Sequence, residues 1–476
     1  MNIIGREKEQ NILQKLFESN KPEFLVVYGR RRVGKTYLIK EFFKNNFSFY
    51  TTGVKKGTYV EKLKNFNNSL IEYGSTIKKR PADWFEAFSR LKILLKNKDV
   101  KTFGANKRKI VFIDELPWLD GPKSSFKSAL DLFWNTYGSS DPDLLLIVCG
   151  SATSWIVKNI LTDRGGFYNR ITRKIHLSPF TLKECEELYI ANKVPFTHRQ
   201  MIESYMVFGG IPYYLNLINN NYSLVQNIDE LCFNENGELH YEYDNLFSSL
   251  FTNYKKHKAI IEKLSKSRNG LTRKDLSEDP NIGEGTGLTD ALNELEQCGF
   301  IRKYQNYRNN KNNVFYQLID PFTLFALTYI KNPNLNSWMS YIDTGEYNNW
   351  QGHSFEIVCL NHVSEIKQEL GINGVTSNEY AWKSKKIRDG AEIDLLIDRK
   401  DETINLCEMK FSKLPFEINK DYSYKLLNKI KTFKEETRCK KSVFLTMVTS
   451  CGLVKNEYSY DVQNSINAEI AFFKNG

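Results

Sequence analysis

Eight residues near the N-terminus have the types and the spacing that bind a nucleoside triphosphate. They follow the pattern G-x-x-x-x-G-K-S/T in the order Gly29, Arg30, Arg31, Arg32, Val33, Gly34, Lys35 and Thr36. The glycines permit a tight turn whose backbone N–H groups surround phosphate oxygens. Lys35 would contact the β- and γ-phosphates, and Thr36 would bind Mg²⁺. The spacing therefore predicts a P-loop that holds ATP with Mg²⁺.

The segments on either side of this loop are those that a P-loop needs. Residues 24–28 form a short apolar run that predicts a buried strand, and residues 37–43 show a helical pattern. A strand–loop–helix context favours a phosphate-binding loop over a simple glycine-containing turn.

A second strand should supply the carboxylate that holds the magnesium ion. Residues 110–113 are apolar, and Asp114 and Glu115 follow them directly. Ligands bind at the carboxyl ends of strands in open α/β sheets, so we assign the metal to Asp114. Glu115 would act as the general base that polarises the attacking water. The alternative is a strand that ends in a solvated acidic turn.

Two later positions could sense or stabilise the γ-phosphate. A third expected strand at 144–149 leads to Ser151, our sensor candidate, with Thr153 as the second choice; the alternative for Ser151 is a helix N-cap. Arg170 precedes an expected strand at 175–180 and could act as an arginine finger toward a neighbouring copy in a homo-oligomer. The alternative for Arg170 is a solvated loop arginine.

These residues resemble the archaeal/bacterial ATPase family of the AAA+/STAND class over roughly residues 1–245. The segments that carry the resemblance lie at 3–7, 28–36, 112–118 and 208–215. The resemblance implies that Gly5, Arg6 and Glu7 line the adenine pocket. It also implies that Pro212, in a Gly-Gly-Ile-Pro element of a helical lid, stands where other AAA+ proteins carry a sensor arginine. Read from the residues alone, this element is a turn between two helices.

The middle of the chain has the element order of a winged helix-turn-helix. Three helices are expected at 257–264, 271–276 (with Thr272 as N-cap) and 288–297, and two strands at 300–304 and 314–318. The hairpin at 301–313 has no acidic residue and interleaves basic residues with tyrosines, a pattern that suits DNA phosphates and sugars: Arg302, Lys303, Tyr304, Tyr307, Arg308 and Lys311. The third helix, by contrast, is acidic. The alternative is a spacer or a protein-interaction module.

Two carboxylates and a lysine recur in the C-terminal third. Residues 391–397 and 403–410 are expected to form adjacent strands of a hairpin, in which Glu408 and Lys410 share a face. If Asp394 faces the same way, Asp394 and Glu408 could bind Mg²⁺ or Mn²⁺. Lys410 would then orient the nucleophilic water and stabilise the transition state of phosphodiester cleavage.

This arrangement resembles the PD-(D/E)xK nuclease superfamily, although the proline of the motif is absent. Glu356, in a helix expected to begin at Gly352, matches the helix acid of that superfamily. Fusion of such a domain to the ATPase is itself a pattern of that ATPase family. The alternatives are a Glu-x-Lys pair on a solvated face and a fold that serves as a non-catalytic binding module.

Composition sets the wider limits. The 476 residues are 41% hydrophobic, which excludes wholesale disorder, and a net charge of +11 favours a polyanionic partner. The densest apolar run, at 144–149, is far shorter than the roughly 20 residues of a membrane span, and the first residues show no export signal. The eight cysteines form no C-x-x-C pair, so we expect reduced thiols in a cytoplasmic protein.

Together these features predict an α/β multidomain protein. The expected parts are a P-loop AAA+-like parallel sheet at 1–177, a helical lid at 178–250, a winged helix-turn-helix at 251–335 and an α/β PD-(D/E)xK-like domain at 345–476. The leading hypothesis is an ATP-hydrolysing, DNA-binding protein with a metal-dependent nuclease-like domain. The alternatives are an ATP-dependent signalling or regulatory switch with a non-catalytic C-terminal module, and a transcription-regulator-like DNA binder.

Overall fold

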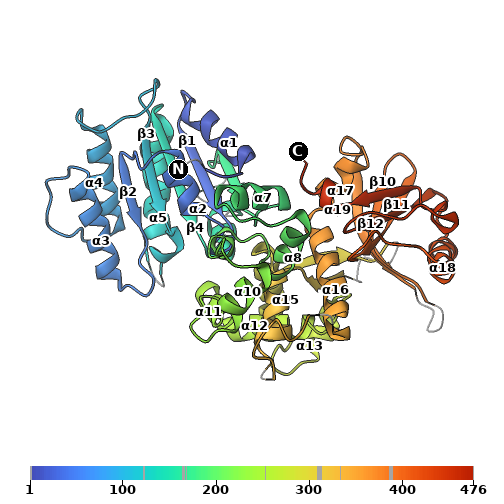
Figure 1. Cartoon of the computed structure of the whole chain (residues 1–476). Coiled ribbons are helices and arrows are strands. Elements are labelled where there is room, and N and C mark those ends of the chain that lie inside the picture. The colour runs from blue at the N-terminus through green and yellow to red at the C-terminus, as the bar shows by residue number, and fades with distance from the viewer. Residues whose placement is uncertain are drawn as a thin grey trace. The chain divides into compact units, whose positions relative to one another are not determined.

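The chain divides into two compact units, residues 1–178 and 179–476 (Figure 1). The computed structural model describes residues 3–121, 124–162, 167, 169–251, 253–307, 314–332, 334–342, 344–384 and 390–474. Arg308 and Lys311 of the expected DNA-binding hairpin lie outside the described residues.

The first unit is built on a five-stranded parallel sheet in the order β2-β3-β4-β1-β5. Its strands are β1 Glu23–Tyr28, β2 Phe49–Thr52, β3 Lys109–Asp114, β4 Leu144–Gly150 and β5 Arg173–His176. Every residue of β4 is buried, as expected for a central strand covered on both faces. The last strand was expected at 175–180, but β5 spans Arg173–His176. It ends before Pro179, which has no N–H group to continue the hydrogen-bonded ladder.

Helices cover this sheet. They are α1 Glu7–Phe17, α2 Lys35–Phe42, α3 Tyr59–Glu72, α4 Trp84–Lys96, α5 Phe126–Thr136 and α6 Thr153–Ile156, with shorter turns η1 Leu116–Trp118, η2 Gly138–Ser140 and η3 Val157–Leu161. Helices α3, α4 and α5 share one apolar core with β1 to β4, and Figure 1 shows α3 and α4 side by side. This packing fixes the carboxyl ends of the strands, where the predicted nucleotide site lies.

The second unit begins with helices, as the sequence predicts. They are α7 Leu182–Ala191, α8 His198–Phe208, α9 Pro212–Leu215, α10 Leu224–Ile228, η4 Asp229–Phe233 and α11 Glu242–Leu250. Capping boxes start α7 and α8 at Thr181 and Thr197. Gly209 and Gly210 have positive φ between α8 and α9, and Pro212 is the first residue of α9. The Gly-Gly-Ile-Pro element is therefore a turn between two helices.

The next segment contains the expected three helices and hairpin strands. They are α12 Tyr254–Leu264, α13 Arg273–Ser277, α14 Thr286–Gln297, β6 Leu271–Thr272, β7 Ile301–Gln305 and β8 Val314–Leu318. The strands form an antiparallel sheet in the order β6-β8-β7. Thr272 caps α13 through a capping box with Asp275, as its position predicts. Helices α15 Pro321–Phe325 and η5 Ala326–Ile330 follow.

The chain ends in a mixed five-stranded sheet in the order β13-β12-β11-β10-β9. The strands are β9 Ser377–Lys383, β10 Glu392–Arg399, β11 Thr403–Lys410, β12 Ser442–Thr449 and β13 Asn464–Asn467, and the helices are α16 Gly345–Asn361, α17 Val363–Glu369, α18 Lys420–Thr437, η6 Glu457–Ser459 and α19 Ala468–Ala471. β10 and β11 form the predicted antiparallel hairpin. Helix α16 does not begin at Gly352, the expected start. It begins seven residues earlier, at Gly345, where the Thr344 side chain caps it.

The cysteines agree with the expectation of reduced thiols. All eight cysteines are free thiols, six of them buried. Within the described part of the chain, no helix has both the length and the apolarity needed to cross a membrane.

Candidate functional site

The P-loop lysine is buried against its own loop. Lys35 Nζ donates to the carbonyl oxygens of Gly29 at 2.9 Å and Arg30 at 2.8 Å. Gly34, with φ of 93°, is the N-cap of α2, so that helix begins at Lys35. The loop carbonyls therefore hold the Lys35 amine at the start of α2. The positive end of the helix dipole lies at the same place and also favours a bound anion.

Gly29 is required where the loop leaves β1. Its φ of 147° is one that side-chain-bearing residues rarely adopt, and a Cβ atom here would collide with the Leu177 carbonyl. Of the other loop residues, Arg30 and Val33 are buried, Arg31 is exposed, and Arg32 has a φ of 72°. The tight turn inferred from the glycine spacing is thus present.

Thr36 and Asp114 meet as the sequence predicts. The Thr36 hydroxyl donates to Asp114 Oδ2 at 2.9 Å, and the Glu115 backbone N–H donates to Asp114 Oδ1 at 2.9 Å. A hydroxyl and a carboxylate are hard oxygen donors of the kind that Mg²⁺ prefers. This pair of residues from α2 and β3 therefore fits a magnesium ion.

Glu115 is held by Ser151 from the neighbouring strand end. The Ser151 hydroxyl and backbone N–H donate to Glu115 Oε2 at 2.9 and 3.1 Å. Burial raises the pKa of Glu115, Lys35 opposes this rise, and Asp114 adds to it. Ser151 is not a helix N-cap, because Ala152 occupies the N-cap position of α6. Ser151 thus positions the carboxylate that we assigned as the base.

Arg6 contacts the region beside the loop. Its guanidinium donates to the Ser178 carbonyl at 2.7 Å and to the Val33 carbonyl at 3.4 Å. Gly5 and Arg6 both have positive φ, and Glu7 is the exposed first residue of α1. Their role at an adenine ring stays a prediction.

Arg170 lies on the surface of the first unit. Its guanidinium forms an ion pair with Asp131 of α5 at 2.7 Å, and just over a third of its side chain is exposed. A role as a finger toward a neighbouring copy would require Arg170 to leave Asp131, so that role stays a prediction.

The second cluster of predicted residues lies on the C-terminal sheet. Leu395 pairs with Cys407 across the hairpin, so the next position in this register sets Asp394 opposite Glu408. Directly opposed residues of an antiparallel pair project to the same face. Lys410 Nζ lies 3.1 Å from Glu408 Oε1. Two carboxylates and one ammonium group therefore share this face, as the spacing predicts.

Sequence reasoning missed two side chains from α18 that bind Glu408. Lys429 Nζ donates to Glu408 Oε2 at 2.7 Å, and the Tyr422 hydroxyl donates to Glu408 Oε1 at 2.6 Å. Tyr422 and Lys429 are seven residues apart, which places them on one face of a helix two turns apart. That spacing was the available signal in the sequence.

The two carboxylates have opposite electrostatic environments. Burial raises the pKa of Asp394, and the neighbouring Glu408 raises it further. Burial also acts to raise the pKa of Glu408, but Lys429, Lys410 and Tyr422 outweigh it and hold that pKa below the usual value. The surroundings therefore favour the charge of Glu408 and disfavour the charge of Asp394, which a further cation would stabilise.

Glu356 of α16 is bound by an arginine from the turn between α12 and β6. Arg268 Nε donates to Glu356 Oε2 at 2.7 Å, and Arg268 Nη2 donates to Glu356 Oε1. His353 lies one turn earlier on α16, and its Nε2 has no hydrogen-bond partner among the described residues. Burial and the charge of Arg268 lower the pKa of His353 to about 4, so this imidazole is neutral at pH 7.

The hairpin residues expected to meet DNA mostly pack inward. Arg302 donates to Gln317 Oε1 at 2.6 Å and to the Asp394 carbonyl at 3.3 Å, and its guanidinium lies over the Tyr304 ring. Tyr307 is buried in the core of the C-terminal sheet. Arg302 and Tyr304 are therefore partly buried and Tyr307 is buried, and contact between this hairpin and a nucleic acid stays a prediction. Lys303 alone among the described members of that set is exposed.

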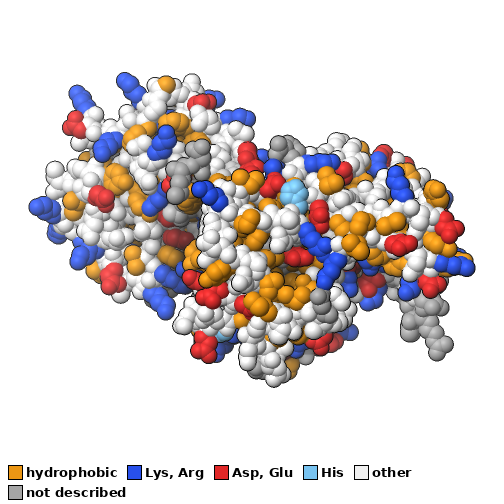
Figure 2. Space-filling view, viewed as in Figure 1, with side chains coloured by type: hydrophobic (Ala, Val, Ile, Leu, Met, Phe, Trp, Pro, Cys, Tyr) orange, Lys and Arg blue, Asp and Glu red, His pale blue; other side chains and the backbone are white. Residues whose placement is uncertain are grey.

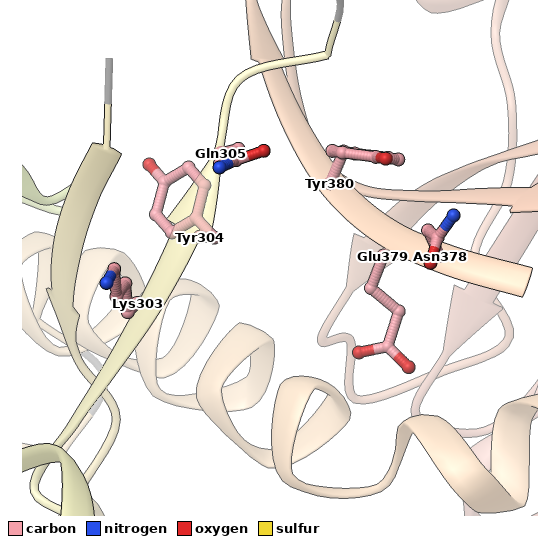
Figure 3. Close-up of a pocket in the computed structure, with 6 residues that line it drawn as sticks. All are labelled: Lys303, Tyr304, Gln305, Asn378, Glu379 and Tyr380. Carbon is pink, nitrogen blue, oxygen red and sulfur yellow. The ribbon is translucent and has the colours of Figure 1, made fainter. Parts of the chain in front are cut away.

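A cavity of about 330 Å³ lies between β7 and β9. Figure 3 shows Tyr304 and Tyr380 on opposite sides of it, with Gln305 between them; the other lining residues are Lys303, Asn378 and Glu379. The Glu379 carboxylate accepts from Lys367 at 2.8 Å and also acts on the charge of Arg302.

The donor atoms of this cluster are suited to a hard cation, but they are shared with internal cations. Asp394, Glu408 and Glu356 supply carboxylate oxygens, the ligands that Mg²⁺ and Mn²⁺ prefer. No group of three or more His, Cys, Asp or Glu side chains in a metal-binding arrangement occurs among the described residues. The donor types suit a divalent ion, but these carboxylates are not grouped as metal ligands in this structure, so a metal ion at this place stays a prediction.

The parallel sheet, the loop around Lys35 and the Thr36–Asp114 pair define a P-loop ATPase. Residues 3–218 match the family described as an ATPase domain predominantly from Archaea. This match covers a little under half of the chain.

Similar proteins occur in Methanocaldococcus jannaschii. An uncharacterised protein is 26% identical over 87% of this chain and 88% of its own length. An uncharacterised ATP-binding protein is 45% identical over 9% of this chain and 73% of its own length. The first relative therefore matches most of this chain.

Two solved structures show a slighter likeness. A Walker-type ATPase of Pyrococcus abyssi is 19% identical, with 68% of this chain and 96% of that chain covered and a TM-score of 0.48. The ORC2 protein of Aeropyrum pernix is 16% identical, with 68% and 92% covered and a TM-score of 0.39. At such TM-scores the likeness says nothing about what this chain binds.

Proposed function

We propose that the chain binds ATP with Mg²⁺ at the P-loop and hydrolyses it. The observation that carries this proposal is the Thr36–Asp114 hydrogen bond beside the buried Lys35. In this proposal Lys35 leaves the loop carbonyls for the β- and γ-phosphates, and Thr36 and Asp114 hold the magnesium ion. The ion, when bound, neutralises charge that develops on the phosphoryl group.

Glu115 would accept a proton from the attacking water, while Ser151 keeps its carboxylate in place. Its raised pKa supports this role, because a base works best when its pKa is closer to the working pH. Ser151 itself would reach the γ-phosphate only by sharing its hydroxyl between the phosphate and Glu115. Arg170 would complete the site of a second copy after leaving Asp131.

Removal of magnesium should abolish ATP hydrolysis by the full chain. With EDTA in excess, we expect the rate of phosphate release to fall at least about 100-fold, because Thr36 and Asp114 would have no ion to hold against the phosphates. Addition of excess Mg²⁺ should restore the rate. Hydrolysis that persists in EDTA would contradict the assigned roles of Thr36 and Asp114.

We further propose that the C-terminal sheet is a PD-(D/E)xK-like domain that cleaves nucleic acid. The proposal is supported by the shared face of Asp394, Glu408 and Lys410 and by the position of Glu356 on a neighbouring helix. Asp394 and Glu408 would bind the divalent ion, and Lys410 would orient the water.

Residues 251–335 are proposed as a winged helix on the basis of their three helices and three-stranded sheet. DNA as the partner is supported by the net charge of +11 and by the exposed Lys303. On the face shown in Figure 2, however, basic side chains are interspersed with acidic ones and form no single patch among the described residues. Helix α14 is acidic, so we do not propose that it enters the major groove of DNA.

The second candidate is an ATP-dependent switch whose C-terminal domain binds a partner without cutting it. One observation favours it: Glu356 and Glu408 are already neutralised by Arg268, Lys429 and Lys410. A site whose charges are balanced internally needs no metal to fold.

A further inference from the structure

Arg268 lies where the acidic residues of the C-terminal cluster converge. It forms two hydrogen bonds with the buried carboxylate of Glu356. Its charge also acts on Asp394 and on His353, so one guanidinium faces all three groups. A cation that serves several carboxylates at once has the role that a divalent ion would have in the proposed nuclease site.

The lysines of the cluster pair with Glu408, and the charge of Lys429 acts on Asp394 as well. Lys429 and Lys410 both form ion pairs with Glu408, and both are carried by the sheet domain itself. Arg268 differs because it comes from the turn at 265–270, between α12 and β6 of the proposed winged helix. Glu356 therefore depends for its neutralisation on a residue from another proposed domain.

Hydrogen bonds connect the turn that carries Arg268 to strands β7 and β8. The Arg268 carbonyl accepts from Gln317 Nε2 at 2.6 Å, and Gln317 Oε1 accepts from Arg302 at 2.6 Å. Arg302 donates in turn to the Asp394 carbonyl, and the Tyr304 hydroxyl donates to the Asn269 carbonyl. A displacement of β7 and β8 from the C-terminal sheet would thus carry Arg268 away with it.

The side chain of Arg268 is also accessible from outside. About half of it is exposed, whereas Glu356 is almost fully buried. An exposed guanidinium can exchange its carboxylate partner for a phosphate group, since both offer two oxygens at matching spacing. The same exchange would leave Glu356 a buried, unpaired carboxylate, which strongly favours capture of another cation.

We propose that Arg268 is an internal counter-ion that keeps a divalent cation out of the C-terminal site, and that a phosphodiester draws it away from Glu356. This inference rests on the proposed metal site at Asp394 and Glu408. It adds a regulation of that site, because Arg268 of the winged helix and the metal ion compete for Glu356. Glu356 becomes available to the metal ion when the winged helix binds nucleic acid.

The test is Mn²⁺ binding by the full chain, measured by titration calorimetry and by the electron paramagnetic resonance signal of free Mn²⁺. We expect Arg268→Ala to bind Mn²⁺ about 10- to 100-fold more tightly than wild type, the size of effect that residues around a metal site commonly have. Arg268→Gln, which keeps most of the side-chain volume, should show the same direction and guards against misfolding of the alanine variant. Adding Asp394→Asn to either variant should remove the gain.

Arg273→Ala is the matched control. Arg273 lies on the adjacent α13 and is exposed. Its guanidinium donates to the Gly285 carbonyl at 2.9 Å. Its loss should leave Mn²⁺ affinity unchanged. A short oligonucleotide should tighten Mn²⁺ binding to wild type but not to Arg268→Ala.

The outcomes separate this inference from the proposed metal site. Equal Mn²⁺ affinity in wild type and in both Arg268 variants, with binding lost in Asp394→Asn, would overturn the counter-ion and leave the metal site standing. Absence of Mn²⁺ binding in every variant would overturn the metal site, and the counter-ion with it.

Discussion

Replacement of Glu115 with Gln should slow ATP hydrolysis at least about 100-fold while ATP still binds. The magnitude is that of losing a general base. Glutamine keeps an oxygen that can accept from the Ser151 hydroxyl, so the local structure should remain, but it cannot take a proton from water. Single-turnover hydrolysis and ATP titration, measured on the same preparation, separate the chemical step from binding.

The pH profile gives a second readout of the same residue. Burial raises the pKa of Glu115 above its ordinary value of 4.5, and a base acts only when ionised. The wild-type rate should therefore reach a plateau above the raised pKa and fall as the pH is lowered through it. Glu115→Gln should lack that fall. A variant with the wild-type rate and profile would remove Glu115 from the mechanism.

Replacement of Asp394 with Asn should abolish metal-dependent cleavage of nucleic acid, with a loss of about 100-fold or more. Asparagine keeps the shape but offers no negative charge to Mg²⁺ or Mn²⁺. Burial and Glu408 already make the charge of Asp394 unfavourable, so the variant should be at least as stable as wild type in thermal unfolding. Labelled DNA and RNA, each with either metal, provide the assay.

Asp398→Asn is the control on the same strand. Asp398 lies four residues further along β10, on the same face, and its carboxylate accepts from Lys441 at 2.8 Å. Its removal should leave cleavage unchanged. If Asp394→Asn cuts as well as wild type, or if wild type cuts neither DNA nor RNA, the nuclease proposal fails and the switch becomes the better account.

The residues of the nucleotide site were predictable because the signal for each is local. The loop at 29–36, the strand before it and the carboxylate at the end of β3 are each a short run whose pattern determines its role. Parallel strands bring their carboxyl ends to one edge, so Thr36 and Asp114 meet although 78 residues separate them.

The partners in the C-terminal cluster were not predictable in the same way. The cross-strand position of Asp394 and Glu408 follows from a short hairpin, but Arg268 reaches Glu356 from 88 residues away. No local pattern marks an exposed arginine in a turn as the partner of a buried glutamate. The start of α16 was misplaced because Gly352 resembles a helix boundary, whereas the cap at Thr344 and the helix packing outweigh one glycine.

The hairpin shows why charge alone misleads. The run of basic residues and tyrosines at 301–307 has the composition of a DNA-binding wing, yet burial of Tyr307 and the hydrogen bonds of Arg302 direct two of its members into the protein. A sequence records which charges are present, but the packing of β7 against β9 decides which of them reach solvent.

ATP binding by the full chain, compared between wild type and Lys35→Ala, tests the central claim most directly. Titration of ATP with Mg²⁺ should give saturable binding to wild type and an affinity at least about 100-fold weaker for the variant, because Lys35 is the loop residue assigned to the β- and γ-phosphates. The folding of both proteins is checked by thermal unfolding. Equal affinity in the two proteins would contradict the assignment of this loop as the ATP site.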